Sequence, residues 1–122
     1  MTIAEILFLN ANGVANLVSV TDTTLNILSG TIQGIRTYSS FIMTLLNSNS
    51  VFSNLNFSEF YPILIYSSFS SLVVSNCSFS DSFEKLGDFE VSAIYLEYNI
   101  SFLISNCKFD SLRNDFVGSV NI

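Results

Sequence analysis

The sequence has no histidine, no tryptophan, one proline and only four lysine and arginine residues among its 122 residues. Without histidine, the chain lacks the side chain that most often serves as general base or metal ligand. Four basic residues and a net charge of −6 leave no basic stripe to neutralise a phosphate backbone, which argues against nucleic-acid binding. With five glycines and no block of like charge there is no linker, so residues 1–122 are expected to form one folded unit.

Long apolar runs are missing as well, although the mean hydropathy is +0.51. No run approaches the roughly 18 to 20 apolar residues that a membrane-spanning helix needs, so no membrane span is expected. The apolar residues form short runs rich in Ile, Val, Leu, Phe and Tyr, separated by Ser, Asn and Gly. Runs of this kind are typical of short buried strands and predict an all-β chain.

An internal repeat is the most informative feature of the sequence. Residues 71–79 (SLVVSNCSF) and 101–109 (SFLISNCKF) share a serine, an apolar run, Ser-Asn-Cys and a closing Phe at a shift of thirty. Weaker copies occur earlier, where residues 50–57 match 72–79 at a shift of twenty-two. Self-similarity at this period indicates a solenoid, in which each repeat forms one coil and stacks on the next.

An apolar strand precedes each copy of the repeat. Residues 63–66 (ILIY) fall on residues 93–96 (AIYL) at the same shift of thirty. Within one unit, Leu72 and Val74 share a face because side chains alternate along a strand. A bend at Asn76 resets this alternation, so that we expect Cys77 and Phe79 to point inward again.

Stacking places equivalent residues of neighbouring coils about 4.8 Å apart, so similar residues should form ladders. We expect an inward ladder of Phe57, Phe79 and Phe109, and a turn ladder of Asn54, Asn76 and Asn106 with Ser29 in the earlier copy. Asparagine suits the turn because it tolerates left-handed backbone angles, and its amide can both donate to and accept from the next asparagine.

Residues 92–109 (SAIYLEYNISFLISNCKF) resemble the repeat of pectin-lyase-fold proteins, in particular large surface and adhesin-like ones. Their coils read approximately GGAIY, a spacer, and I-x-I-x-N-C-x-F; here Val91-Ser92 replaces the Gly-Gly. The resemblance covers nearly the whole chain and implies an all-β, right-handed parallel β-helix. About five coils of 18 to 30 residues are expected, with uncapped ends, as a fragment of a longer β-solenoid.

A leucine-rich repeat is the alternative fold, because F-x-I-x-x-C-x-F also resembles that pattern with Cys in the usual Asn place. The extra strand before each unit, at residues 63–66 and 93–96, takes the place of the helical segment that such repeats need.

Catalysis has to be tested on residues, because enzymes and non-enzymes share the β-helix fold. The polygalacturonase histidine has no counterpart here, and no paired-aspartate motif is present. Neither Arg36 nor Arg113 lies in the Arg-x-Pro pattern of pectate lyases, since Pro62 is the only proline. We therefore expect no catalytic residue, no cofactor and no enzyme activity.

The acidic residues group at two places where coils are expected to bend outward. They are Asp81, Glu84, Asp88 and Glu90, and then Asp110 and Asp115 beside Arg113. Neither group has the spacing of a calcium loop, so both are interpreted as solvated loops and no metal ligand is assigned.

Cys77 and Cys107 fall at equivalent inward positions of adjacent coils. Their expected separation suits a disulfide, but stacking alone would also bring two small apolar side chains together, and both interpretations stay open. Three Asn-x-Ser sequons begin at Asn56, Asn76 and Asn99. We expect Asn76 to be inaccessible in the turn ladder, which leaves Asn56 and Asn99 as candidate glycosylation acceptors if the protein is secreted.

The leading hypothesis for function is a structural, scaffolding or adhesive module of a larger extracellular or surface assembly. Its expected partners are neighbouring coils of a longer chain, or other subunits, at the open ends. The alternative is a carbohydrate-binding or polysaccharide-active domain whose catalytic residues lie elsewhere. Its stacking platforms would be exposed tyrosines, namely Tyr61, Tyr66, Tyr95 and Tyr98.

Overall fold

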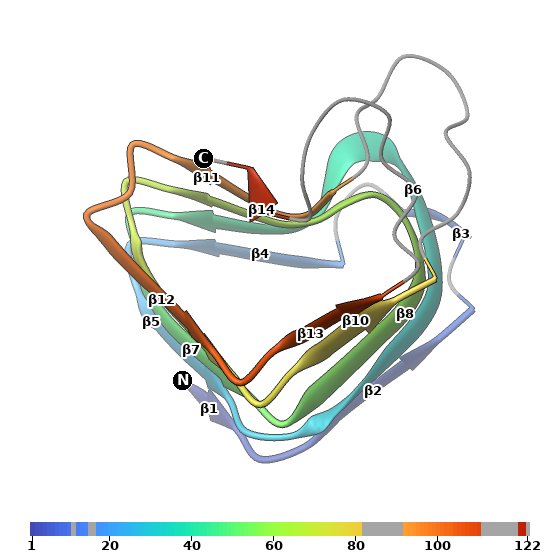
Figure 1. Ribbon diagram of the computed structural model, residues 1–122. Coiled ribbons are helices and arrows are strands. Elements are labelled where there is room, and N and C mark those ends of the chain that lie inside the picture. Colours follow the sequence, from blue (N-terminus) through green and yellow to red (C-terminus); the bar gives the residue numbers. More distant parts are fainter. Residues whose placement is uncertain (11, 15–16, 82–91, 111–119, 122) are drawn as a thin grey trace.

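The computed structural model describes residues 1–10, 12–14, 17–81, 92–110 and 120–121, and their regular secondary structure is entirely β-strand (Figure 1). Every pairing among these strands is parallel. The strands stack into three walls around one core, an arrangement compatible with a parallel β-helix.

Each wall collects one strand from every turn of the chain. Wall 1 holds β1 (Thr2–Ile3), β5 (Thr24–Ile27), β7 (Asn49–Ser53), β9 (Ser71–Ser75) and β12 (Ser101–Ser105), hydrogen-bonded in that order. Wall 2 holds β2 (Ile6–Leu9), the first parts of β6 (Gly30–Leu46) and β8 (Leu55–Ser68), β10 (Ser78–Ser80) and β13 (Lys108–Asp110). Wall 3 holds β4 (Val18–Thr21), the second parts of β6 and β8, β11 (Ser92–Glu97) and β14 (Val120–Asn121).

The strands β6 and β8 continue from wall 2 into wall 3, so these two walls belong to one bent sheet. The short strand β3 (Asn12–Val14) pairs with β6 where that sheet bends. At Gly30, the first residue of β6, a Cβ atom would collide with the carbonyl of Ile6 in the neighbouring strand. Glycine is therefore required at this position, because the backbone of the neighbouring coil leaves no room for a Cβ atom.

The strand register follows the internal repeat, with one difference. Paired residues are 22 to 30 positions apart, as in Asn49 with Ser71 and Ser71 with Ser101, which lies within the expected 18 to 30 residues per coil. In wall 3 the shift between β8 and β11 is twenty-nine, since Ile65 pairs with Ile94, and not the expected thirty.

The inward side chains form an apolar core of stacked columns. Phe57 and Phe79 are completely buried, and their rings stack with centroids 4.9 Å apart. Phe79 stacks on Phe109 at the same centroid distance, with ring planes 5° apart. Parallel register produces this column, because Phe79 pairs directly with both neighbours.

The bends between walls contain left-handed residues in every turn. All ten non-glycine residues with positive φ among the described residues have φ between 49° and 56° and fall into three columns. One column, between walls 1 and 2, is Asn54, Asn76 and Asn106. The second, between walls 3 and 1, is Asp22, Asn47, Phe69 and Tyr98, and the third, at the end of wall 2, is Asn10, Glu59 and Asp81 together with Gly34.

Backbone hydrogen bonds run along these columns from coil to coil. The N–H of Asn54 donates to Ser75 O at 3.1 Å, and the N–H of Asn76 donates to Ser105 O at 3.1 Å. The same bond to the following coil is made by Asn10, Asp22, Asn47, Phe69 and Asp81. The left-handed conformation therefore turns the chain and continues the parallel hydrogen bonding through each bend.

The expected burial of Asn76 is wrong, since its side chain is exposed, like those of Asn54 and Asn106. The amide Nδ2 of Asn54 donates to the carbonyl of Leu28 at 3.3 Å, a bond to the backbone of the neighbouring coil. A left-handed residue at an outer bend directs its side chain away from the core, which explains the exposure.

Replacing Phe79 by alanine should destabilise the fold by about 3–5 kcal/mol, because the ring is fully buried between two others. The matched change Phe109→Ala should cost clearly less, since Phe109 is only partly buried and stacks on one ring. Urea unfolding monitored by circular dichroism measures both. Equal losses would contradict the stacked column.

Candidate functional site

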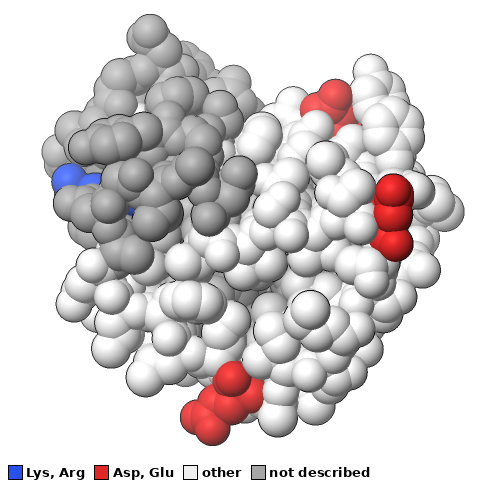
Figure 2. Space-filling model, turned by 180° about the vertical axis from the view of Figure 1, so that it is seen from behind, with Lys and Arg blue, Asp and Glu red and all other residues white. Residues whose placement is uncertain are grey.

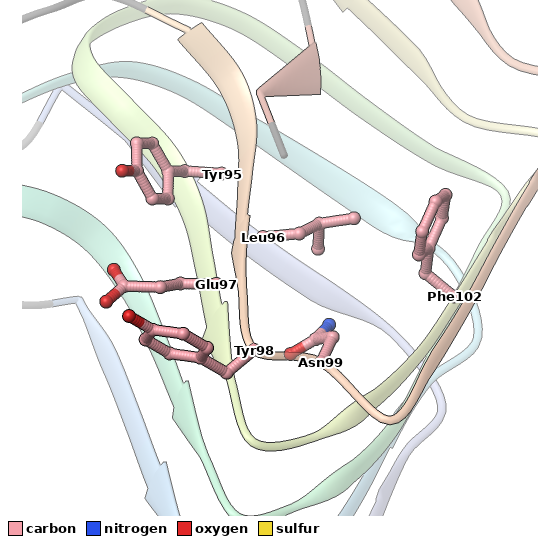
Figure 3. A pocket seen from close by; sticks show the side chains of 6 residues that line it. All are labelled: Tyr95, Leu96, Glu97, Tyr98, Asn99 and Phe102. Atoms are coloured by element: carbon pink, nitrogen blue, oxygen red, sulfur yellow. The ribbon is translucent and has the colours of Figure 1, made fainter.

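A pocket of about 400 Å³ opens where β11 turns into β12, on the last described turn of wall 1 (Figure 3). It is lined by Tyr95, Leu96, Glu97, Tyr98, Asn99 and Phe102. In Figure 3 Tyr95, Glu97 and Tyr98 project from one side of the chain, whereas Leu96 and Phe102 lie on the other. The pocket therefore has an apolar side toward the core and a polar, aromatic side toward the surface.

This bend contains one extra residue, and Asn99 holds it to the neighbouring coil. Leu96 pairs with Ser67 and Ser101 pairs with Ser71, so the bend is one residue longer than in the coil below. The Nδ2 of Asn99 donates to Ser67 Oγ at 3.0 Å, and its Oδ1 accepts from the N–H of Ser70 at 3.2 Å. The insertion is thus bonded to the neighbouring coil, and it accounts for the change of register from twenty-nine to thirty.

Aromatic side chains form two further columns outside the core. Phe41 stacks on Tyr66 with ring centroids 4.1 Å apart, and Tyr95 follows Tyr66 at 5.7 Å. At the next bend Phe69 stacks on Tyr98 at 5.4 Å, and Tyr98 is 72% exposed. Both columns lead to the pocket, because Tyr95 and Tyr98 line it.

A carboxylate lies beside the first of these columns. The hydroxyl of Tyr66 donates to Glu97 Oε2 at 3.0 Å. Burial raises the pKa of the Tyr66 phenol, and Glu97 raises it further, whereas the Ser68 hydroxyl acts in the opposite direction. Tyr66 therefore stays a neutral donor near neutral pH and orients the Glu97 carboxylate at the rim of the pocket.

The second column places aromatic residues in a conformation they rarely adopt. Phe69 and Tyr98 have φ of 51° and 52°, at the bend where earlier coils have Asp22 and Asn47. In those coils a polar side-chain hydrogen bond joins the two bends, because Asn47 Nδ2 donates to Asp22 Oδ1 at 2.6 Å. Left-handed backbone angles cost a bulky residue about 1–2 kcal/mol, and such strain concentrates at functional positions.

The last described turns of walls 1 and 2 expose positions that other coils bury. Phe102 is 46% exposed, whereas its partner Leu72 in the coil below is completely buried. Three further residues of the last coil are only half-buried, namely Ile104, Cys107 and Phe109. Their equivalents in the coil below are buried, namely Val74, Cys77 and Phe79. Within the described ranges, no strand pairs with the outer edge of β12 or β13.

The two cysteines lie at equivalent positions and are free thiols. The Sγ of Cys77 contacts Ser75 O at 3.3 Å, and the Sγ of Cys107 contacts Ser105 O at 3.3 Å. Burial, together with the neighbouring Cys107, raises the pKa of the Cys77 thiol to about 11. Cys77 is therefore mostly protonated near neutral pH, which lowers the fraction of reactive thiolate.

The candidate glycosylation acceptors differ from each other. Asn56 is exposed, as expected, and its Oδ1 accepts from Ser78 Oγ at 2.6 Å. Asn99 is partly buried and bonded to the coil below, which disfavours it as an acceptor. Asn76 is more exposed than Asn99, contrary to the expectation that the turn ladder would make Asn76 inaccessible.

The expected exposure of Tyr61 is wrong, since only 5% of this residue is exposed, and it offers no stacking platform. Glu84, Asp88, Glu90, Arg113 and Asp115 lie outside the described residues. Sequence reasoning missed Phe69, Glu97 and Phe102 as parts of the site. The repeat alignment contained a signal for Phe102, because it falls on Leu72 in the last copy.

The surface carries few and separated charges. Figure 2 shows one face as predominantly uncharged, with acidic side chains standing apart from one another. Where the structure describes the chain, no three His, Cys, Asp or Glu residues cluster so as to hold a metal ion. The same residues include no helix long and apolar enough to cross a membrane.

Replacing Asn99 by alanine should destabilise the chain by about 1–3 kcal/mol, because the buried N–H of Ser70 loses its acceptor. The matched surface change Asn56→Ala should cost about 0.5 kcal/mol or less. Thermal unfolding compares the two variants. If both lose the same small amount, Asn99 does not bind the coils together.

Comparison with known proteins gave no match to a family model, to a curated protein or to a solved structure.

Proposed function

We propose that this chain is a segment of a right-handed parallel β-helix that serves as a structural or adhesive module of a larger extracellular or surface assembly. The parallel strand pairing, the three walls and the apolar core support this proposal. The resemblance of the repeat to surface and adhesin-like β-helix proteins points in the same direction. Walls built from stacked coils give a rod that suits scaffolding more than catalysis.

The observation that carries the proposal is the exposed surface of β12 and β13. Phe102 and Leu103 are consecutive residues of β12 and lie on opposite faces of this strand. Phe102 is 46% exposed and Leu103 is 57% exposed. Only Phe102 occupies an inward column, because its partner Leu72 belongs to the core. Among the described residues, the outer edge of β12 carries unpaired backbone groups beside the apolar side chain of Phe102. A further coil could pair with these backbone groups and cover this side chain.

The proposed partner surface is therefore a coil of the same architecture. It would add parallel strands to β12 and β13 and cover Phe102, Ile104 and Phe109 with apolar side chains of its own. Backbone hydrogen bonds would provide affinity, and the matching apolar columns would provide specificity. The tyrosines and Glu97 would then line the outside of the joint.

Placing a charge in the inward column should abolish coil addition. We expect the wild-type chain to self-associate through its exposed edges, and the Phe102→Lys variant to associate at least tenfold more weakly. The matched control Leu103→Lys, on the outward face of the same strand, should retain most of the association. Sedimentation velocity over a concentration series measures all three proteins.

Neither substitution removes a fully buried side chain, so both variants should fold, and circular dichroism checks this. A wild-type chain that is a stable, soluble monomer at all concentrations would contradict the proposal. Equal weakening by both lysines would show a non-specific hydrophobic contact instead of coil stacking.

A second candidate function, carbohydrate binding, is supported by the aromatic columns that end at the pocket. Tyr98 is exposed and Tyr95 is partly exposed at the pocket, and Glu97 adds a carboxylate acceptor beside them. The negative charge of the chain favours a neutral or amino sugar over a polyuronate.

Titration of tyrosine fluorescence with a neutral glucan, an amino-sugar polymer and a polyuronate tests this function. Binding should shift the signal with the first two ligands, and Tyr98→Ala should remove the shift. Leu103→Ala, an exposed change outside the pocket lining, serves as the control. No shift with any polymer would exclude the carbohydrate function.

A further inference from the structure

Cys77 and Cys107 are stacked in successive coils. Each directly precedes a strand of wall 2, and the following residues Ser78 and Lys108 pair in register. The N–H of Lys108 donates to the carbonyl of Cys77 at 3.0 Å, so the backbone bond extends to the cysteines. Equivalent residues of such strands lie about 4.8 Å apart, within the roughly 4.4–6.8 Å between Cα atoms that disulfides accept.

The two side chains also point the same way. The Sγ of Cys77 lies 3.8 Å from Phe52 O, and the Sγ of Cys107 lies 3.6 Å from Val74 O, the equivalent carbonyl one coil further on. Cys107 is also among the groups that raise the pKa of the Cys77 thiol. The two thiols therefore lie at equivalent places of adjacent coils and point in the same direction.

Access to the two sulfurs differs. Cys77 is 3% exposed and lies inside the core, whereas Cys107 is partly exposed in the last described turn of wall 2. An external reagent therefore reaches Cys107 first. Cys77 can react only with a group already attached to its neighbour.

We propose that Cys77 and Cys107 form an inter-coil disulfide by exchange with a low-molecular-weight disulfide. In the first step the Cys107 thiolate attacks the external disulfide, forms a mixed disulfide and releases one small thiol. In the second step the Cys77 thiolate attacks the sulfur of Cys107 and releases the second small thiol. The two protein thiols are oxidised, the external disulfide is reduced to two thiols, and each released thiolate takes up one proton.

The rate of closure should depend on pH through Cys77. Its raised pKa, about 11, means that the thiolate fraction grows about tenfold per pH unit from neutral pH up to that value. Closure should therefore be slow at neutral pH, with the mixed disulfide on Cys107 accumulating, and should accelerate as pH rises. If the attacking thiol were exposed and had an ordinary pKa, the rate of closure would stop rising at a lower pH.

The disulfide would clamp the last described coil to the one below it. It closes a loop across the shift of thirty residues between Ser78 and Lys108. Such a crosslink restricts the unfolded chain and should raise the midpoint of thermal unfolding. Formation of the disulfide does not require a partner coil at the exposed edge of β12 and β13.

Oxidised glutathione is the probe, applied to the full wild-type chain at a series of pH values. Intact mass spectrometry should show a glutathione adduct first, and then loss of that adduct with removal of two hydrogens from the chain. Peptide mapping without reductant should identify the Cys77–Cys107 link, and reduction should reverse the rise in unfolding midpoint.

Two variants separate the steps. Cys77→Ser should stop at the glutathione adduct on Cys107, and Cys107→Ser should stay unmodified because Cys77 is buried. A serine hydroxyl can donate to the backbone carbonyls that the cysteine sulfurs contact, so both variants should fold. Peptide mapping of the wild-type chain tests the disulfide even if a variant does not fold. An adduct on Cys107 that persists up to high pH, or no linked peptide at all, would overturn the proposal.

Discussion

Parallel hydrogen bonding between successive coils is the constraint on which the rest of the structure depends. In a parallel pair every residue lies beside its equivalent, so a repeat in the sequence becomes a column in space. Phe79 therefore stacks between Phe57 and Phe109, and Cys107 lies beside Cys77. Any side chain that suits one coil must also suit the coils above and below it.

The three bends meet this constraint with left-handed residues. At seven of these residues the chain turns while the N–H donates to the next coil, so the hydrogen bonding between coils continues there. Asparagine adopts this conformation readily and occupies the bend between walls 1 and 2 in three coils, at Asn54, Asn76 and Asn106. Phe69 and Tyr98 are left-handed at the bend where earlier coils have Asp22 and Asn47, and Tyr98 lines the pocket there together with Asn99.

The all-β class, the parallel stacking and the phenylalanine column follow from the spacing of the repeat, because periodicity fixes register. The extra residue in the bend between β11 and β12 does not follow from the repeat, since an insertion in a bend leaves both flanking strands intact. The exposure of Asn76 and the burial of Tyr61 were misjudged because alternation fails where the backbone turns left-handed or a long strand bends. For the site, sequence indicates Tyr95 and Tyr98 as candidates, but the Tyr66–Glu97 bond joins different coils and needs the fold.

Amide hydrogen exchange at the bends tests the stacked architecture most directly. The residues Asn54 and Asn76 have exposed side chains, yet their N–H groups donate to Ser75 and Ser105 of the following coils. We expect these two amides to exchange as slowly as those of the adjoining strands β7 and β9. Exchange at the rate of an open surface turn would contradict it, because the coils would then not be hydrogen-bonded through their bends.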